Sequence, residues 1–112
     1  MDPFLRMPSF SRRHTSRVDV AEGVSVCWRS NRRDDISRVR NLSVGGLFIA
    51  TATPPRVGAT AKIDFLVQEG QIRADATVCH AQLAHGMGLK FTAVPEEDRA
   101  RLGLLIMRLR RT

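Results

Sequence analysis

The stretch Ala61-Lys62-Ile63-Asp64-Phe65-Leu66-Val67 decides the fold class, because apolar and polar side chains alternate along it and only Leu66 is out of step. A period of two residues is typical of a β-strand that buries one face and exposes the other. Glu69-Gly70 is typical of a hairpin turn, and the alternation returns at residues 72–79. These segments predict an antiparallel hairpin with one apolar face.

Strand-like alternation continues on both sides of this hairpin. A polar cluster at residues 31–35 is typical of a hairpin turn, and the prolines and glycine within residues 54–58 are typical of a loop. Together these segments predict six strands, at residues 24–29, 35–43, 46–51, 61–68, 72–79 and 85–91. Six short strands separated by turns predict a barrel or a sandwich.

The periodicity changes near the C-terminus, where apolar side chains recur at helical spacing. The acidic run Glu96-Glu97-Asp98 follows Pro95, and arginines gather at residues 108–111, which matches the charge preference of the two ends of a helix. The apolar stripe consists of Leu102, Leu105, Ile106 and Leu109. We expect a helix at about residues 95–111 that packs on an open end or side of the barrel, since so short a helix gains most of its stability from packing.

The composition is that of one basic domain. The chain has 112 residues, enough for a single modest core, and a formal net charge of +7 carried almost entirely by arginine. This charge favours an anionic partner such as a nucleotide, a nucleic acid, an acidic protein or a lipid head group, although surplus arginine can also simply solvate a surface. Any output of a one-domain chain must pass through a partner.

Cysteine and histidine do not predict a metal centre. Cys27 and Cys79 are far apart and lack the spacing of a zinc site, so we expect two reduced thiols in the core. No segment has the length of a transmembrane helix, and residues 1–11 lack the apolar region of a signal peptide. We expect a cytoplasmic protein with a flexible N-terminal tail at residues 1–11.

Two short motifs lie before and at the end of the first predicted hairpin: Arg13-His14-Thr15-Ser16-Arg17 and Asn41-Leu42-Ser43-Val44-Gly45-Gly46. The arginines carry planar, permanently charged groups suited to phosphate oxygens or to the O6/N7 edge of guanine. Asn41 and Ser43 offer small polar side chains, and Gly46 permits a positive φ and close backbone approach. One strand out and one strand back fit between Arg17 and Asn41, so we expect the motifs to meet.

These motifs resemble the RxxxR and [D/N]xSxxG elements of the PilZ domain family, which binds the bacterial second messenger cyclic di-GMP. The resemblance covers about residues 12–110 and includes Gly45-Gly46-Leu47-Phe48-Ile49 and Gly86-Met87-Gly88-Leu89-Lys90-Phe91. It implies a mainly β fold, a six-stranded antiparallel β-barrel with a C-terminal α-helix. It also implies a single PilZ-like domain at residues 12–112, with the barrel at about residues 18–93.

The resemblance further implies the ligand site. Arg13 and Arg17 are expected to bind the phosphates and guanine edges or to stack on the bases. Asn41 and Ser43 are expected to hydrogen-bond a guanine, and Gly46 to leave room for its ring. Arg12 and Gly45 are secondary candidates, and Arg12 leaves open whether one or two ligand molecules bind. Many family members have Asp at the position of Asn41. Compared with Asp, the Asn41 side chain keeps a hydrogen-bond acceptor but lacks the negative charge.

The RxxxR element alone is a weak signal. Sixteen of the 112 residues are arginine, so about two matches are expected from composition. A second match, Arg29-Ser30-Asn31-Arg32-Arg33, coincides with the predicted turn, and its simplest interpretation is a solvated basic turn. The specificity comes from the order in which Arg13 and Arg17 are followed by Asn41, Ser43 and Gly46.

The predicted function is a bacterial, non-enzymatic cyclic di-GMP receptor without a cofactor or metal. Ligand is expected to order the segment before Val18, which then signals in trans to an unidentified protein partner. We expect a monomer or a weak dimer.

Three other functions are less consistent with the sequence. A PilZ-like protein-interaction adaptor that binds no nucleotide has no need for both motifs. A nucleic-acid binder is disfavoured because the chain has few aromatic residues, and those within strand patterns are expected to pack in the core rather than stack on bases. Catalysis is disfavoured because Ser43 has no evident histidine base or orienting carboxylate.

Overall fold

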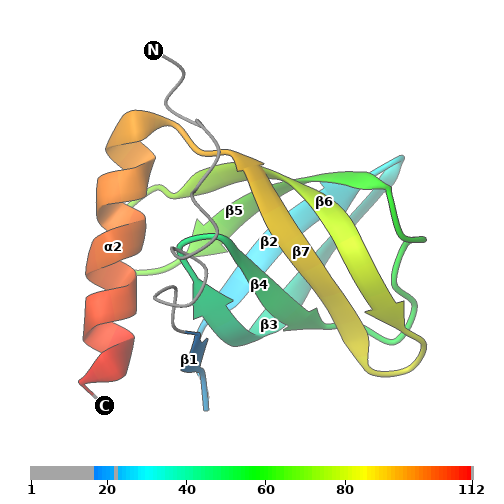
Figure 1. Ribbon diagram of the computed structural model, residues 1–112, viewed down its shortest axis with the longest axis horizontal. Coiled ribbons are helices and arrows are strands. Elements are labelled where there is room, and N and C mark those ends of the chain that lie inside the picture. The colour runs from blue at the N-terminus through cyan, green and yellow to red at the C-terminus, as the bar shows by residue number, and fades with distance from the viewer. Residues whose placement is uncertain (1–16, 22, 112) are drawn as a thin grey trace, which may run out of the picture.

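The computed structural model describes residues 17–21 and 23–111, which form seven strands and one helix (Figure 1). The alternating segments form extended strands because this conformation buries every second side chain. The elements are β1 (Val18–Asp19), β2 (Ser25–Ser30), β3 (Arg33–Ser43), β4 (Gly46–Ala50), β5 (Thr60–Leu66), β6 (Arg73–Gln82), β7 (Gly86–Ala93) and α2 (Glu96–Arg110).

Six antiparallel strands close into a barrel. Neighbouring strands follow the order β3-β2-β5-β6-β7-β4, and β4 pairs again with β3, so the sheet has no free edge between them. The short strand β1 pairs with the end of β3. The predicted six-stranded barrel with a C-terminal helix is therefore confirmed. Strand β1 was not predicted, because two residues cannot display an alternating pattern.

The interior of the barrel is apolar. Its largest fully buried side chains are Trp28, Leu42, Leu47, Ile49, Ile72 and Met87. The indole Nε1 of Trp28 donates a hydrogen bond of 2.9 Å to Oγ of Ser37, so this buried polar group is satisfied. Helix α2 stands beside the barrel (Figure 1) and adds its predicted stripe, Leu102, Leu105, Ile106 and Leu109, to the same core.

Two ion pairs hold α2 against the start of β6 and the loop that precedes it. The Asp98 carboxylate is fully buried and accepts hydrogen bonds from the backbone N–H of Arg73, at 2.8 Å, and from its Nε, at 2.9 Å. Nε of Arg108 donates to Oε2 of Glu69 at 2.6 Å. The hydrogen bonds from Arg73 and Arg108 hold the pKa values of Asp98 and Glu69 below their ordinary values of 3.8 and 4.5.

The cysteines depart from the prediction. Cys79 is exposed and Cys27 is partly buried, so they are not a pair of core thiols. Cys79 lies on the outer face of β6 by simple alternation, as Arg73 and Asp75 do. The strand has a β-bulge at Cys79, because Val78 pairs with Leu89 and His80 pairs with Gly88, and the residue that this bulge takes out of the alternation is His80.

Two features that would define other classes of protein are missing from the part of the chain that the structure describes. None of its helices combines the length and apolar character needed to cross a bilayer. No group of three or more histidine, cysteine, aspartate or glutamate side chains within residues 17–21 and 23–111 could hold a metal ion.

Candidate ligand-binding site

The pairing of β1 with β3 brings Arg17 to Asn41. Asp19 of β1 is the register partner of Asn41, which places Arg17, two residues earlier in the chain, at the same end of β3. Nη1 of Arg17 donates a hydrogen bond of 2.7 Å to Oδ1 of Asn41. This contact joins the two sequence motifs across 24 positions of the chain.

Asn41 faces outward because β3 contains a β-bulge. Val39 is buried and pairs with Ile49, whereas Asn41 pairs with Phe48. Arg40 is therefore an extra residue without a register partner on β4. A bulge shifts the alternation by one position, so Arg40 and Asn41 both lie on the outside of the barrel.

Ser43 closes the hairpin between β3 and β4. It pairs with Gly46 across the two-residue turn of Val44 and Gly45. Its Oγ accepts a hydrogen bond of 3.2 Å from the Gly45 N–H and donates one of 3.4 Å to the Gly46 carbonyl. The side chain is buried. The Ser43 hydroxyl is thus engaged by its own turn.

Gly46 is required by the packing of β4 on β7. A Cβ atom at this position would lie 2.2 Å from the carbonyl oxygen of Leu89. The close backbone approach that glycine permits is made here to β7. The positive φ that glycine also permits is not used at this position, since the described glycines with a positive φ are Gly23, Gly58 and Gly70.

Gly45 has more space than its neighbour. It is exposed in the turn, and a Cβ atom there would meet nothing closer than Oγ of Ser43 at 3.9 Å.

The remaining predicted site residues, Arg12 and Arg13, lie outside the described residues, as does the predicted tail at residues 1–11. The structure therefore brings together Arg17, Asn41 and the β3–β4 turn, but it does not describe the first arginine of the RxxxR element.

The second RxxxR match has a structural role. Nε of Arg29 bonds Oδ1 of Asp34 at 2.5 Å, and Nη2 of Arg33 bonds Oδ2 of Asp35 at 3.0 Å. The guanidinium of Arg33 also lies 5.0 Å above the centre of the Trp28 ring. The predicted hairpin turn is confirmed, although it is shorter than expected because β3 already begins at Arg33.

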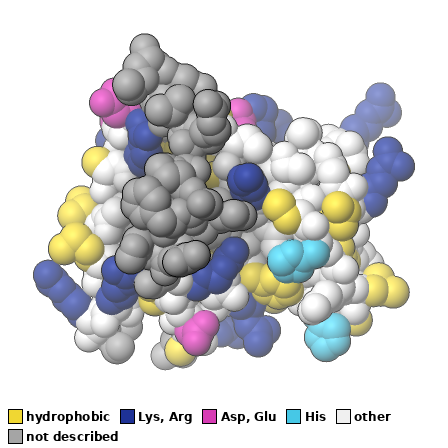
Figure 2. All heavy atoms as spheres, viewed as in Figure 1, with side chains coloured by type: hydrophobic (Ala, Val, Ile, Leu, Met, Phe, Trp, Pro, Cys, Tyr) yellow, Lys and Arg dark blue, Asp and Glu magenta, His cyan; other side chains and the backbone are white. Residues whose placement is uncertain are grey.

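Two further cations stand close to the site and were not singled out from the sequence. Arg40 is the bulge residue next to Asn41, and Lys90 is the register partner of Gly46. Both side chains are exposed, and neither has a hydrogen bond or ion pair to another described residue. Figure 2 shows Lys and Arg side chains spread over this face, with few Asp or Glu side chains among them. The surroundings of the site suit an anion.

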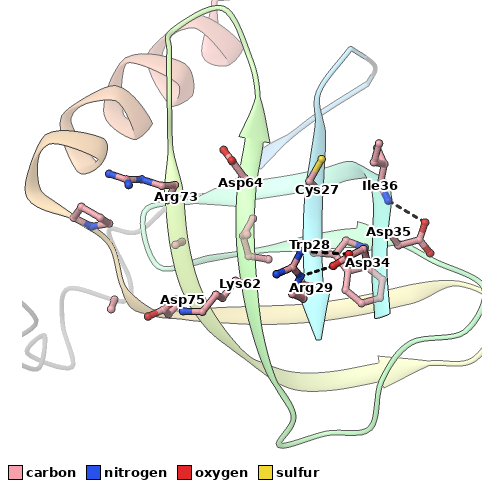
Figure 3. A pocket seen from close by; sticks show the side chains of 14 residues that line it. Cys27, Trp28, Arg29, Asp34, Asp35, Ile36, Lys62, Asp64, Arg73 and Asp75 are labelled. Carbon is pink, nitrogen blue, oxygen red and sulfur yellow. Dashed lines mark hydrogen bonds and ion pairs between the residues drawn. The ribbon is translucent and has the colours of Figure 1, made fainter. Parts of the chain in front are cut away.

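A separate hollow lies on the outer surface of β2, β3, β5 and β6 (Figure 3). Its volume is about 1140 Å³. Two ion pairs form between its charged groups: Arg29 with Asp34, and Lys62 with Asp75 at 3.0 Å. Neither Arg17 nor Asn41 lines this hollow.

The family model for the PilZ domain matches residues 11–108. The match spans most of the chain and includes both motifs. The chain therefore belongs to the PilZ domain family. No curated protein matches it.

Solved structures support the same fold. The chain is 20% identical to the PilZ domain of Escherichia coli YcgR, a structure described with c-di-GMP, with a TM-score of 0.70 over 89% of this chain and 92% of that one. An uncharacterised Legionella protein has 18% identity and a TM-score of 0.56, covering 85% of this chain and 94% of that one. MrkH, described as a c-di-GMP-dependent transcription regulatory factor, has 18% identity and a TM-score of 0.66. The match covers 88% of this chain and 51% of MrkH.

Proposed function

We propose that this protein is a bacterial, cytoplasmic and non-enzymatic receptor for cyclic di-GMP. The ligand is bound between the RxxxR segment and the β3–β4 turn. The proposed ligand-binding residues are Arg13, Arg17, Asn41, Ser43 and Gly46, with Arg12 and Gly45 as secondary contacts. The hydrogen bond between Arg17 and Asn41 is the observation that carries this proposal, because it unites the two motifs at one point of the surface. The family membership and the described ligand of the YcgR domain support the choice of nucleotide.

The chemistry of Arg17 suits this role. Its described partner is the neutral amide of Asn41, so no carboxylate among the described residues neutralises its positive charge. Charge-assisted hydrogen bonds contribute about 1.5–3 kcal/mol each. Several such bonds to a ligand with two phosphates give a micromolar complex, which corresponds to about −8 kcal/mol.

Ser43 and Gly46 are proposed to contact a guanine of the ligand. A guanine contact from Ser43 requires its hydroxyl to leave the Gly46 carbonyl, and the hydrogen bond there is long, at 3.4 Å. Gly46 has no side chain, and its proposed role is to leave room for the guanine ring.

We further propose that ligand orders the segment before Val18, which then presents a new surface to a protein partner in trans. Strand β1 follows Arg17 directly and lies close to α2, so a change at the arginines reaches the helix through two residues. Deuterium exchange over residues 6–17 is expected to slow on addition of cyclic di-GMP. Equal exchange with and without ligand would contradict this part of the proposal.

Isothermal titration calorimetry of cyclic di-GMP into the purified protein tests the receptor function. We expect saturable binding by the natural sequence, loss of detectable binding in Arg17→Ala, and no heat with GTP. Arg32→Ala is the matched control, because it removes an exposed arginine from the β2–β3 turn and is expected to bind normally. A folded natural protein that produces no heat would instead support the adaptor function.

A further inference from the structure

One row of residues crosses the outside of the barrel from the proposed site to β6. Asn41 of β3 is the register partner of Phe48 on β4. Phe48 is in turn the partner of Gly88 on β7, and Gly88 is the partner of His80 on β6. Neighbouring strands lie about 4.8 Å apart. Along this row the backbone of Phe48 is therefore about 5 Å from that of Asn41, and the backbone of His80 is about 14 Å from it.

Both ends of the row are turned outward by β-bulges. Without the bulge at Arg40, the alternation of β3 would direct Asn41 into the barrel. Without the bulge at Cys79, the alternation of β6 would direct His80 inward, as it does Val78. Bulges are common next to functional sites, where they redirect a side chain. Two bulges therefore bring polar groups onto the same row.

The middle and far part of the row is an aromatic surface. The rings of Phe48 and His80 are stacked with their centres 5.9 Å apart and an angle of 28° between their planes. The His80 ring lies over Gly88, where a Cβ atom would be 2.4 Å from its Cε1. The Phe48 ring lies over Gly86, where a Cβ atom would be 2.7 Å from its Cε1. The two glycines allow both rings to rest close to the strand backbone.

These rings are only partly covered by the protein. His80 is exposed and Phe48 is partly buried, whereas the apolar residues on the inner side of the same strands are almost fully buried. Figure 2 shows histidine side chains beside hydrophobic ones on the face formed by β4 and β7. An exposed, nearly flat aromatic pair offers a stacking surface for a nucleobase.

We infer that the Phe48–His80 pair is a base-stacking subsite that takes one guanine of the ligand, while Arg17 and Asn41 hold the other end of the molecule. This inference rests on the proposed binding of cyclic di-GMP. A cyclic dinucleotide carries two bases on one phosphate-linked ring, so it can engage both ends of the row at the same time. The pair thereby contributes affinity and a preference for ligands with two bases.

The test is a calorimetric titration of cyclic di-GMP into His80→Ala and His80→Phe. Because stacking of a base on an aromatic ring contributes strongly to affinity, His80→Ala is expected to bind about tenfold more weakly. His80→Phe retains an aromatic ring and is expected to bind like the natural protein. His85→Ala removes another exposed histidine, next to β7, and is expected to have no effect.

The outcomes separate this inference from the proposed function. If the natural protein binds and Arg17→Ala does not, but His80→Ala binds as tightly as the natural protein, the subsite is refuted and the receptor function stands. If the natural protein does not bind, the receptor function itself fails. Phe48→Leu, which keeps an apolar cover over Gly86, provides a second variant and is expected to weaken binding in the same direction as His80→Ala. Thermal melts of each variant establish that it is folded.

Discussion

The two outer surfaces of the barrel use their charged side chains differently. On the surface formed by β2, β3, β5 and β6, Arg29 and Lys62 are each paired with a carboxylate on a neighbouring strand. On the surface formed by β1, β3, β4 and β7, Arg17 contacts only an amide among the described residues, and Lys90 has no polar partner there.

This difference shows which arginines can serve a ligand. An arginine that is already bonded to a carboxylate must lose that partner before it can bind a phosphate, whereas Arg17 needs only to share or exchange an amide. The second RxxxR match illustrates the point, because Arg29 and Arg33 both hold aspartates. Substitutions on the paired side should therefore leave ligand binding unchanged, and those on the Arg17 side should change it. Gly46 is the exception, because its backbone holds β4 on β7.

The largest effect is expected for Gly46→Ala. The added Cβ would lie 2.2 Å from the Leu89 carbonyl oxygen, so β4 and β7 must separate and the free energy of unfolding should fall by about 3 kcal/mol. Urea denaturation measures this change. Gly45→Ala is the matched control on the same turn and is expected to stay within about 0.5 kcal/mol of the natural protein. Equal stability of the two variants would show that the approach of the strands does not require glycine.

The next largest effect is expected for Asp98→Asn on the helix. The substitution removes the charge from a buried group that holds Arg73, so we expect a loss of about 2 kcal/mol at pH 7, with cyclic di-GMP binding unchanged. Glu97→Gln, an exposed neighbour on the same turn of α2, is the control and should change stability little.

The carboxylates of Asp98 and Glu69 predict that the fold loses stability in acid. The folded-state pKa values of Asp98 and Glu69 lie below their ordinary values of 3.8 and 4.5. As the pH falls, the unfolded chain therefore binds protons at these two groups before the folded protein does. Their contribution to stability is therefore present above about pH 5 and is lost as the pH falls through the folded-state values. Urea titrations should give a shallower pH dependence for Asp98→Asn, with the Glu69 contribution remaining. An unchanged slope would contradict this assignment.

The smallest effect is expected for Arg29→Ala. Its ion pair with Asp34 is exposed to solvent, and such pairs contribute little to stability. We expect a thermal melt close to that of the natural protein and unchanged titration by cyclic di-GMP. A clear loss of ligand affinity would break the contrast between the two surfaces, because it would give the second RxxxR match a role in binding.

Much of the fold could be predicted because its strands obey simple patterns. The alternation at residues 61–67 and 72–78 marks one buried face, and the stripe of α2 marks another. The two bulges could not be predicted, since an extra residue is defined only against its partner strand. For this reason the outward position of His80 was not predicted. Cys79 was expected in the core because free cysteines are commonly buried, although the alternation of β6 places it outside.

Local chemistry along the chain was enough to indicate a barrel, a C-terminal helix and an Asn41–Gly46 turn, because burial periodicity and turn composition act over a few residues. The contact of Arg17 with Asn41, the need for glycine at position 46 and the stacking of Phe48 on His80 depend on the tertiary structure. Each joins strands that are distant along the chain. Only the closure of the barrel sets the register in which their side chains meet.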